Sequence, residues 1–162
     1  MRELALADAH PKFDVSLVTP DGPAFEGVAE MIVVPGAVGE IGVLARHAPL
    51  VATLKAGSTR IHLGENEVLE FATGPGFFKV ELDRALALVD DAVNVKEIDD
   101  ERARTQLEAA KAELEKVEAG ESLADRWQLE QRIRHAENQL HVVSGGEGGH
   151  TRPLVSAGRE HA

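Results

Sequence analysis

The hydrophobic pattern of this chain changes its period once, near residue 97, and this change constrains the fold more than any other feature. Before it, apolar residues alternate or cluster in the short runs that strands favour. After it, they recur at the 4-3-4-3 spacing of a helix face. The sequence therefore predicts a β unit followed by helices. Because strand and helix patterns do not alternate, it disfavours a parallel α/β sheet.

The first part predicts an antiparallel β-sandwich or barrel over residues 13–97. Strands are expected over residues 13–18, 28–34, 41–44, 59–63, 68–72, 77–82 and 85–89. Clusters of glycine, proline, asparagine and aspartate separate these runs and supply the turns. The chain has one tryptophan, five phenylalanines and no tyrosine, so its core has to be built from valine, leucine, isoleucine and alanine.

The second part predicts an antiparallel two-helix hairpin over residues 98–143. Asp99 is the expected N-cap of the first helix, and Gly120 its end. Ser122, with Asp125 three residues later, is expected to begin the second helix after a break of about two or three residues. Each helix carries one narrow apolar seam: Ala103, Leu107, Ala110, Leu114 and Val117 in the first, and Leu129, Ile133, Ala136, Leu140 and Val143 in the second.

The ends of the chain and its net charge indicate where in the cell it works and which partners it can have. Residues 1–12 and the glycine-rich residues 144–162 lack periodicity and are expected to be disordered. The sequence shows no signal-peptide pattern and no apolar run near the ~20 residues of a membrane helix. A net charge of -11 argues against nucleic acid or anionic lipid as a direct partner. We therefore expect a cytoplasmic chain without direct lipid insertion, which reaches a membrane only through another protein.

Residue types that could carry catalysis do not converge in this sequence. The acidic pairs at 90–91 and 99–100 are adjacent, so their side chains diverge on a strand or a helix. His135 and His141 are six residues apart and do not share a helix face. The chain has no cysteine, which excludes disulfides, thiolate zinc sites and a cysteine nucleophile. We predict no catalytic residue, no metal site and no cofactor.

A family resemblance rests on four stretches in a fixed order. Residues 39–42 (GEIG), followed by His47-Ala48-Pro49-Leu50 and by Gly57, resemble the signature of the epsilon subunit of F-type ATP synthases, called delta in mitochondria. Residues 13–27 are similar to that family's first hairpin, and residues 73–77 (TGPGF) to its Ser-Gly-Gly-Phe stretch. Residues 98–103 (IDDERA) match its I-D-x-x-R-A pattern. The resemblance runs through about residues 13–143 and agrees with the switch from strands to helices.

The resemblance implies a non-catalytic rotor subunit of a proton-translocating F-type ATP synthase. Its β-sandwich would couple the gamma subunit to the polar loops of the c-ring. Its hairpin would either fold down on the sandwich or extend along gamma toward the alpha/beta head, where it inhibits ATP hydrolysis. The subunit would lie at the cytoplasmic face of the bacterial cell membrane, held there by the complex.

Carried over residue by residue, the resemblance gives partner contacts rather than a reaction centre. Glu40 would face the c-ring loops and His47 would lie in the loop that faces gamma, while Gly39, Gly42 and Pro49 would set the hairpin geometry. The alternative is a turn that simply needs its glycines, with a solvated Glu40.

One departure from the family concerns the residues before the histidine. Relatives usually have Pro-Gly there, whereas this chain has Ala45-Arg46. Arg46 must therefore avoid a left-handed backbone conformation or accept strain.

In some relatives the folded-down hairpin binds ATP, and this chain keeps part of that motif, namely Ile98, Asp99, Arg102 and Ala103. Val93 and Ala109 stand where the motif would have an acidic and a basic residue, and His135 and Gln139 stand where arginines would. A triphosphate needs a cluster of cations. We therefore predict no ATP binding, with Asp99 as a helix cap and Arg102 as a surface charge.

Two other classes of protein remain open from the residues alone. A free-standing β-sandwich adaptor with a helical hairpin would behave as a monomer and would not co-purify with a membrane complex. An enzyme would need a convergent polar pocket.

Overall fold

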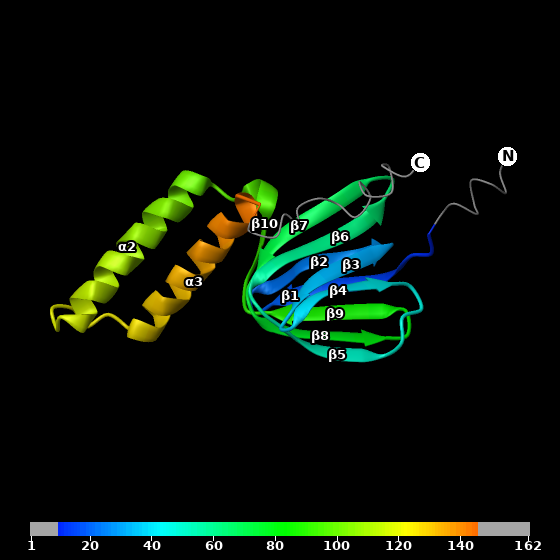
Figure 1. Cartoon of the computed structure of the whole chain (residues 1–162), viewed down its shortest axis with the longest axis horizontal. Helices are drawn as coiled ribbons and strands as arrows, with labels where there is room; N and C mark the ends of the chain where they lie inside the picture. The colour runs from blue at the N-terminus through cyan, green and yellow to red at the C-terminus, as the bar shows by residue number, and fades with distance from the viewer. Residues whose placement is uncertain (1–9, 146–162) are drawn as a thin grey trace.

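The computed structural model describes residues 10–145, in which a β-sandwich is followed by two helices (Figure 1). The strands are β1 (Phe13–Thr19), β2 (Gly22–Ala29), β3 (Met31–Gly36), β4 (Gly39–Leu44), β5 (Leu50–Leu54), β6 (Gly57–Gly64), β7 (Glu67–Thr73), β8 (Gly76–Glu81), β9 (Arg84–Val89) and β10 (Ala92–Asn94). A 3-10 turn, η1 (Val95–Glu97), leads into the helices α2 (Asp100–Glu118) and α3 (Arg126–Val143). The predicted fold class is confirmed. The segments expected to be disordered, 1–12 and 144–162, lie for the most part outside the described residues.

The strands form one continuous sheet folded into two layers. The strand order is β10-β7-β6-β3-β5-β8-β9-β1-β2, with β4 paired to β3 off this path. Among the described strands, β1 and β9 run parallel and the other pairs are antiparallel. The contact between β3 and β5 is a single residue pair, Gly36 with Leu54, where the sheet passes from one layer to the other.

The core lies between the two layers, and alternate residues of each strand point into it. It consists mainly of aliphatic side chains with three phenylalanines: Phe13, Val15, Leu17, Ile32, Val34, Val43, Leu54, Ile61, Phe71, Phe78, Val80 and Val89. The sequence predicted this aliphatic composition.

The structure corrects the strand assignments in two respects. A continuous strand over 28–34 is wrong, because β2 ends at Ala29, Glu30 interrupts the run, and β3 begins at Met31. Strands β5 and β10 were not predicted, and most of β2 was implied only by the resemblance of residues 13–27 to the family's first hairpin. Strand β2 contains glycine, proline and alanine, which give a weak strand signal.

The hairpin has the predicted caps at α2 and a different start at α3. The Asp99 carboxylate accepts a hydrogen bond from the Arg102 backbone N–H at 3.1 Å, and Gly120 takes φ +77° just beyond α2. The N-cap of α3 is Asp125 rather than Ser122, so the connection is longer than predicted. Ser122 instead donates to Glu113 Oε1 at 2.5 Å.

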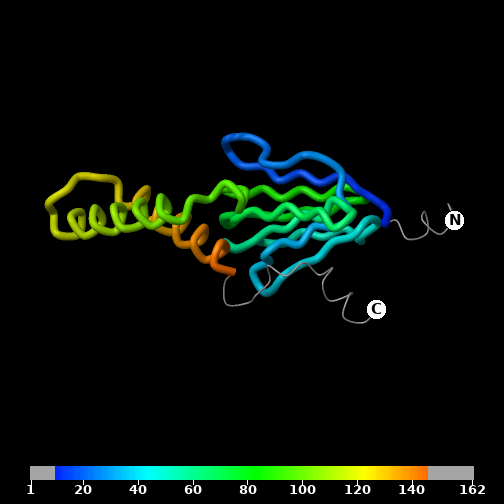
Figure 2. Tube along the Cα trace, turned by 90° about the horizontal axis from the view of Figure 1, so that it is seen from above, coloured from blue at the N-terminus to red at the C-terminus, as the bar shows by residue number. Residues whose placement is uncertain are grey.

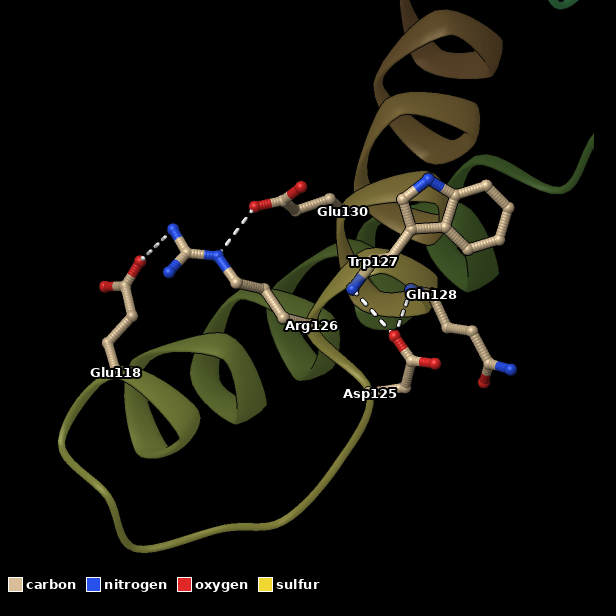
Figure 3. A network of polar contacts seen from close by, with 6 residues as sticks. All are labelled: Glu118, Asp125, Arg126, Trp127, Gln128 and Glu130. Atoms are coloured by element: carbon tan, nitrogen blue, oxygen red, sulfur yellow. Dashed lines mark hydrogen bonds and ion pairs between the residues drawn. The ribbon is translucent and has the colours of Figure 1, made fainter.

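Figure 3 shows how the polar residues close this connection. The Asp125 carboxylate accepts from the backbone N–H groups of Trp127 and Gln128, which fixes the first turn of α3. Arg126 lies between Glu118 on α2 and Glu130 on α3, at 3.3 and 3.0 Å. These pairs are exposed, so the arginine orients the connection and contributes little stability.

The seam between the helices is largely the predicted one. Ala103 and Ala110 of α2 are buried, as are Leu129 and Ala136 of α3. At its end Val142 is buried in place of the predicted Val143. In both views the hairpin projects from one end of the sandwich, so the molecule is elongated (Figures 1 and 2).

Candidate docking surfaces

Strand β4 distributes the signature residues along the sandwich. Glu40 is the second residue of β4, next to the turn at residues 37–38 and opposite Pro35. His47 follows the other end of β4, beyond Leu44. In Figure 1, β4 runs from the end nearest the hairpin toward the opposite end. The two predicted partner contacts are therefore not brought together but lie toward opposite ends of the sandwich.

The two signature glycines differ in how strictly their positions require glycine. Gly39 takes φ +144°, which L side chains rarely adopt. A Cβ on Gly42 would lie 2.9 Å from Met31 Cε, the end of a flexible side chain that can shift. Pro49 is exposed and directly precedes β5.

Glu40 forms an ion pair that the sequence did not reveal. Its Oε2 atom lies 3.1 Å from Arg60 Nη2 on β6, and the side chains are 36% and 4% exposed, respectively. Glu40 is therefore not simply a solvated turn residue. The sequence offered only a weak signal, an arginine beside Ile61 in the expected strand over residues 59–63.

His62 lies two residues beyond Arg60 on the same face of β6 and is also buried. Burial and the positive charge of Arg60 lower the pKa of His62, and these effects exceed the raising effect of Glu30. His62 is therefore neutral at neutral pH.

The loop after β4 shows which backbone conformation Arg46 adopts where relatives usually have glycine. Arg46 has φ +61°, so the chain accepts the left-handed conformation, and its backbone N–H donates to Asp83 Oδ1 at 3.2 Å. His47 donates from Nδ1 to the Ala48 carbonyl at 2.7 Å. In the neutral imidazole this hydrogen bond leaves Nε2 as an acceptor.

An exposed apolar face, which the sequence reading missed, lies across β5, β8 and β9. We define the apolar face as Val51, Phe77 and Leu88, which are 72%, 62% and 47% exposed. Strand register places Phe77 beside Leu88, and Val51 follows on the adjacent strand β5. Large apolar side chains gathered on an exposed sheet surface indicate a protein interface.

Helix α3 contacts the sandwich where β6 begins and β7 ends. Asn138 Nδ2 donates to the Thr73 carbonyl at 3.0 Å and to the Gly57 carbonyl at 3.4 Å. Gly57 and Thr73 are directly opposite each other in the sheet. One side-chain amide therefore joins the hairpin to the end of a strand pair.

A second contact lies beside it. His135 Nε2 is 3.5 Å from Asp90 Oδ2, and His135 Nδ1 is 3.9 Å from Asp91 Oδ2. A Cβ on Gly74 would lie 1.6 Å from Asp90 Oδ1, so Gly74 makes room for this carboxylate. We call Asn138, His135, Asp90 and Asp91 together the clamp.

The residues that match the ATP motif border a shallow groove between α2 and the sandwich. Asp99 caps α2, Ile98 is half-buried, Arg102 is exposed and Ala103 is buried. The groove has a volume of about 270 Å³ and is lined by Val93, Glu97, Ile98, Asp99, Arg102, Ala103, Gln106 and Gln139. Among these lining residues, Arg102 is the one cation, and Glu97 and Asp99 supply two carboxylates.

A neighbouring groove of about 490 Å³ lies along the two helices. Among the described residues that line it, Arg132 is the only arginine or lysine. The carboxylates of Asp91 and Glu113 line it too. Neither groove gathers the cations that a triphosphate needs.

Within residues 10–145, no group of three or more histidine, aspartate or glutamate side chains is arranged to hold a metal ion. In the same part of the chain, neither helix combines the length and apolar character needed to cross a membrane.

Comparison with known solved structures supports the fold. The chain is similar to a chain in the mitochondrial ATP synthase of Euglena gracilis (OSCP/F1/c-ring, rotational state 1), with a TM-score of 0.60 and 24% identity. The match covers 80% of this chain and 81% of the other.

Comparison with known sequences identifies the family. The ATP synthase epsilon chain of Halalkalibacterium halodurans is 38% identical over 133 residues, which is 82% of this chain and 98% of the relative. The sodium ion specific epsilon chain of Propionigenium modestum is 35% identical over 133 residues, 80% of this chain and 96% of the relative. Residues 12–95 match the family described as ATP synthase, Delta/Epsilon chain, beta-sandwich domain. The chain therefore belongs to the ATP synthase delta/epsilon chain family.

Proposed function

We propose that this chain is a non-catalytic central-stalk subunit of a proton-translocating F-type ATP synthase, in which it couples the gamma subunit to the c-ring. The observation that carries the proposal is the match to bacterial epsilon chains over 98% of a relative's length, across both the strands and the helices. The sandwich over residues 13–97 would be the docking unit, and the hairpin over residues 98–143 the regulatory unit. The complex would hold the chain at the cytoplasmic face of the cell membrane.

The gamma subunit is the partner that the apolar face suits best. Val51, Phe77 and Leu88 would lose water on contact with an apolar surface of gamma, which favours a stable interface. The nearby loop with His47 offers an imidazole Nε2 acceptor for a polar contact at the rim. Gamma would thus meet the sandwich on its broad side and at the end away from the hairpin.

The c-ring would meet the Glu40 end. Glu40 and its partner Arg60 offer a polar contact there, and Val38, in the adjacent turn, is 103% exposed. Polar ring loops are suitable partners for such a surface because hydrogen bonds, rather than apolar burial, would fix the register.

The hairpin would act as a regulator of ATP hydrolysis. It is joined to the sandwich by the few polar contacts of the clamp, so release costs little and an extended form that reaches the alpha/beta head is accessible.

Reconstitution with purified gamma and c-ring tests the proposal. We expect the chain to bind both together, and Phe77→Asp to abolish binding to gamma while Leu123→Asp, an apolar-to-acidic change at a fully exposed residue in the hairpin connection, leaves it intact. A wild-type chain that stays monomeric with both partners would instead support the free-standing adaptor.

A further inference from the structure

Three neighbouring strands, β6, β3 and β4, place Arg60 and Glu40 on one face of the sheet. Arg60 on β6 lies opposite Val33 on β3, and Val33 lies opposite Gly42 on β4. Residues in register point to the same face, and so does Glu40, two residues before Gly42. Strands are about 4.8 Å apart, so the Arg60 side chain must cross β3 to reach Glu40.

The burial of Arg60 makes its need for a carboxylate strong. Its side chain is 4% exposed, and its Nε and Nη1 atoms have no hydrogen-bond partner among the described residues. A buried charge is tolerated only when it is paired. Glu70, opposite Arg60 on β7, accepts a hydrogen bond from Ser58 Oγ at 2.8 Å. Of the carboxylates in residues 10–145, Glu40 is the one that forms an ion pair with Arg60.

We propose that Arg60 is a positioning residue for the ring contact: it fixes the Glu40 carboxylate at the end of the sandwich that meets the c-ring. This inference rests on the proposed function. Because the Arg60 charge offsets that of Glu40 in the ion pair, the ring loop is recognised by directional hydrogen bonds rather than by net charge. The partner group is therefore a neutral polar side chain or a backbone amide of the ring loop, and binding depends weakly on salt.

The position of the carboxylate can be separated from its charge. Glu40→Asp keeps the charge but shortens the side chain by one methylene, so it loses the contact with Arg60. We expect Glu40→Asp to weaken binding of the full chain, in complex with gamma, to c-rings in nanodiscs by about fivefold, close to the effect of Glu40→Gln. The matched change Glu67→Asp, at an exposed carboxylate on β7, should leave binding unchanged.

A double-mutant cycle tests whether Arg60 acts through Glu40. We expect Arg60→Met to weaken binding as much as Glu40→Gln, and the double variant to bind within about twofold of either single variant. Binding of Arg60→Met should also become more dependent on salt, because the positive charge that offsets Glu40 in the ion pair is then lost. A purely structural role for Arg60 would not produce this coupling or this change in slope.

Three outcomes decide the matter. Wild-type affinity in Glu40→Asp, or single-variant effects that multiply in the double variant, would overturn the role of Arg60 and leave the proposed function standing. A wild-type chain that does not bind the ring would overturn the ring contact itself. If Arg60→Met does not fold, as judged by thermal unfolding, the exposed Glu40→Asp variant still provides the test.

Discussion

The hydrogen bonds of the Asn138 amide predict how strongly the hairpin is held on the sandwich. Asn138→Ala removes a donor that serves two carbonyls, those of Thr73 and Gly57, at 3.0 and 3.4 Å. Each neutral hydrogen bond has a net stabilisation of about 0.5–1.5 kcal/mol, and the longer contact lies at the weak end. Both sites are only partly buried, so water can satisfy the exposed carbonyls after the change. We therefore expect the docked hairpin to lose about 1–2 kcal/mol relative to the released one, a factor of about 5 to 30 in the equilibrium.

The chain is well suited to measuring this equilibrium. It has no cysteine of its own, so cysteines introduced at the exposed positions Glu67 and Ala112 can carry a fluorescent donor and acceptor. Transfer efficiency then reports the separation of hairpin and sandwich. The single tryptophan, Trp127, lines a groove with Pro20 and Asp90 and gives an independent signal without labels.

Two control variants distinguish loss of the Asn138 contact from a general effect of substitution on α3. Gln128→Ala removes an exposed amide on the same helix and should not change the docked fraction. Asn138→Asp keeps the shape of the side chain but replaces the donor by a charged acceptor, so it should release the hairpin more than Asn138→Ala does. If Asn138→Ala leaves both signals at their wild-type values, the amide does not hold the hairpin and the reasoning is refuted.

Four further predictions follow from the same structure. Glu40→Gln should lower the free energy of unfolding by about 1–2 kcal/mol, which is less than for a fully buried pair because Glu40 is part-exposed. Adding Arg60→Met should restore part of this stability. A double variant that is less stable than Glu40→Gln in chemical denaturation would contradict this. A chain ended at Glu97 should fold and still join gamma and the ring, with ATPase activity of the complex equal to or above that of the full chain; loss of binding would place the helices in the docking surface. ATP should bind the isolated chain no more tightly than about millimolar, or -4 kcal/mol; a micromolar constant by calorimetry, abolished by Arg102→Ala, would contradict this. The folded state lowers the pKa of His62, so the unfolded chain binds its proton more readily and stability should fall as the pH drops below about 6.5; His62→Gln should flatten this slope in thermal unfolding at pH 5.5–7.5, and an equal slope would exclude His62 as its source.

The fold was predictable where the hydrophobic period was clear. Asp99 and Gly120 bound the first helix because capping is a local property of a few residues. The start of α3 was not predictable in the same way, because Ser122 and Asp125 are both good N-caps. Ser122 bonds Glu113 across the hairpin, and only the tertiary structure contains that contact.

The docking surfaces were less predictable than the fold. Strand β5 was missed partly because Val51 points outward and yet is apolar, so the expected alternation with polar residues is absent. The same property makes it part of the apolar face. An apolar surface of the kind proposed here for a partner thus weakens the pattern by which its own strand is recognised.

Arg60 illustrates a second limit of sequence reading. Its partner Glu40 is twenty residues away along the chain, and their encounter depends on β6 and β4 flanking β3. The local sequence TRIHL gives a strand but does not reveal which strands lie beside it. The family motif drew attention to Glu40 as an outward contact, whereas the structure adds the cation that holds it from within.

The contiguous signature reads in sequence as one site, but β4 divides it into two. Residues 39–42 belong to the end near the hairpin and Arg46 and His47 to the other, because a six-residue strand spans about 20 Å. Each end has its own support from elsewhere in the chain, Arg60 for Glu40 and Asp83 for the loop at Arg46. Substitutions at one end should therefore leave the other contact intact, and Glu40 and His47 should act additively on assembly with ring and gamma. Such independence is what a subunit needs if one short strand connects two partners on opposite sides of it.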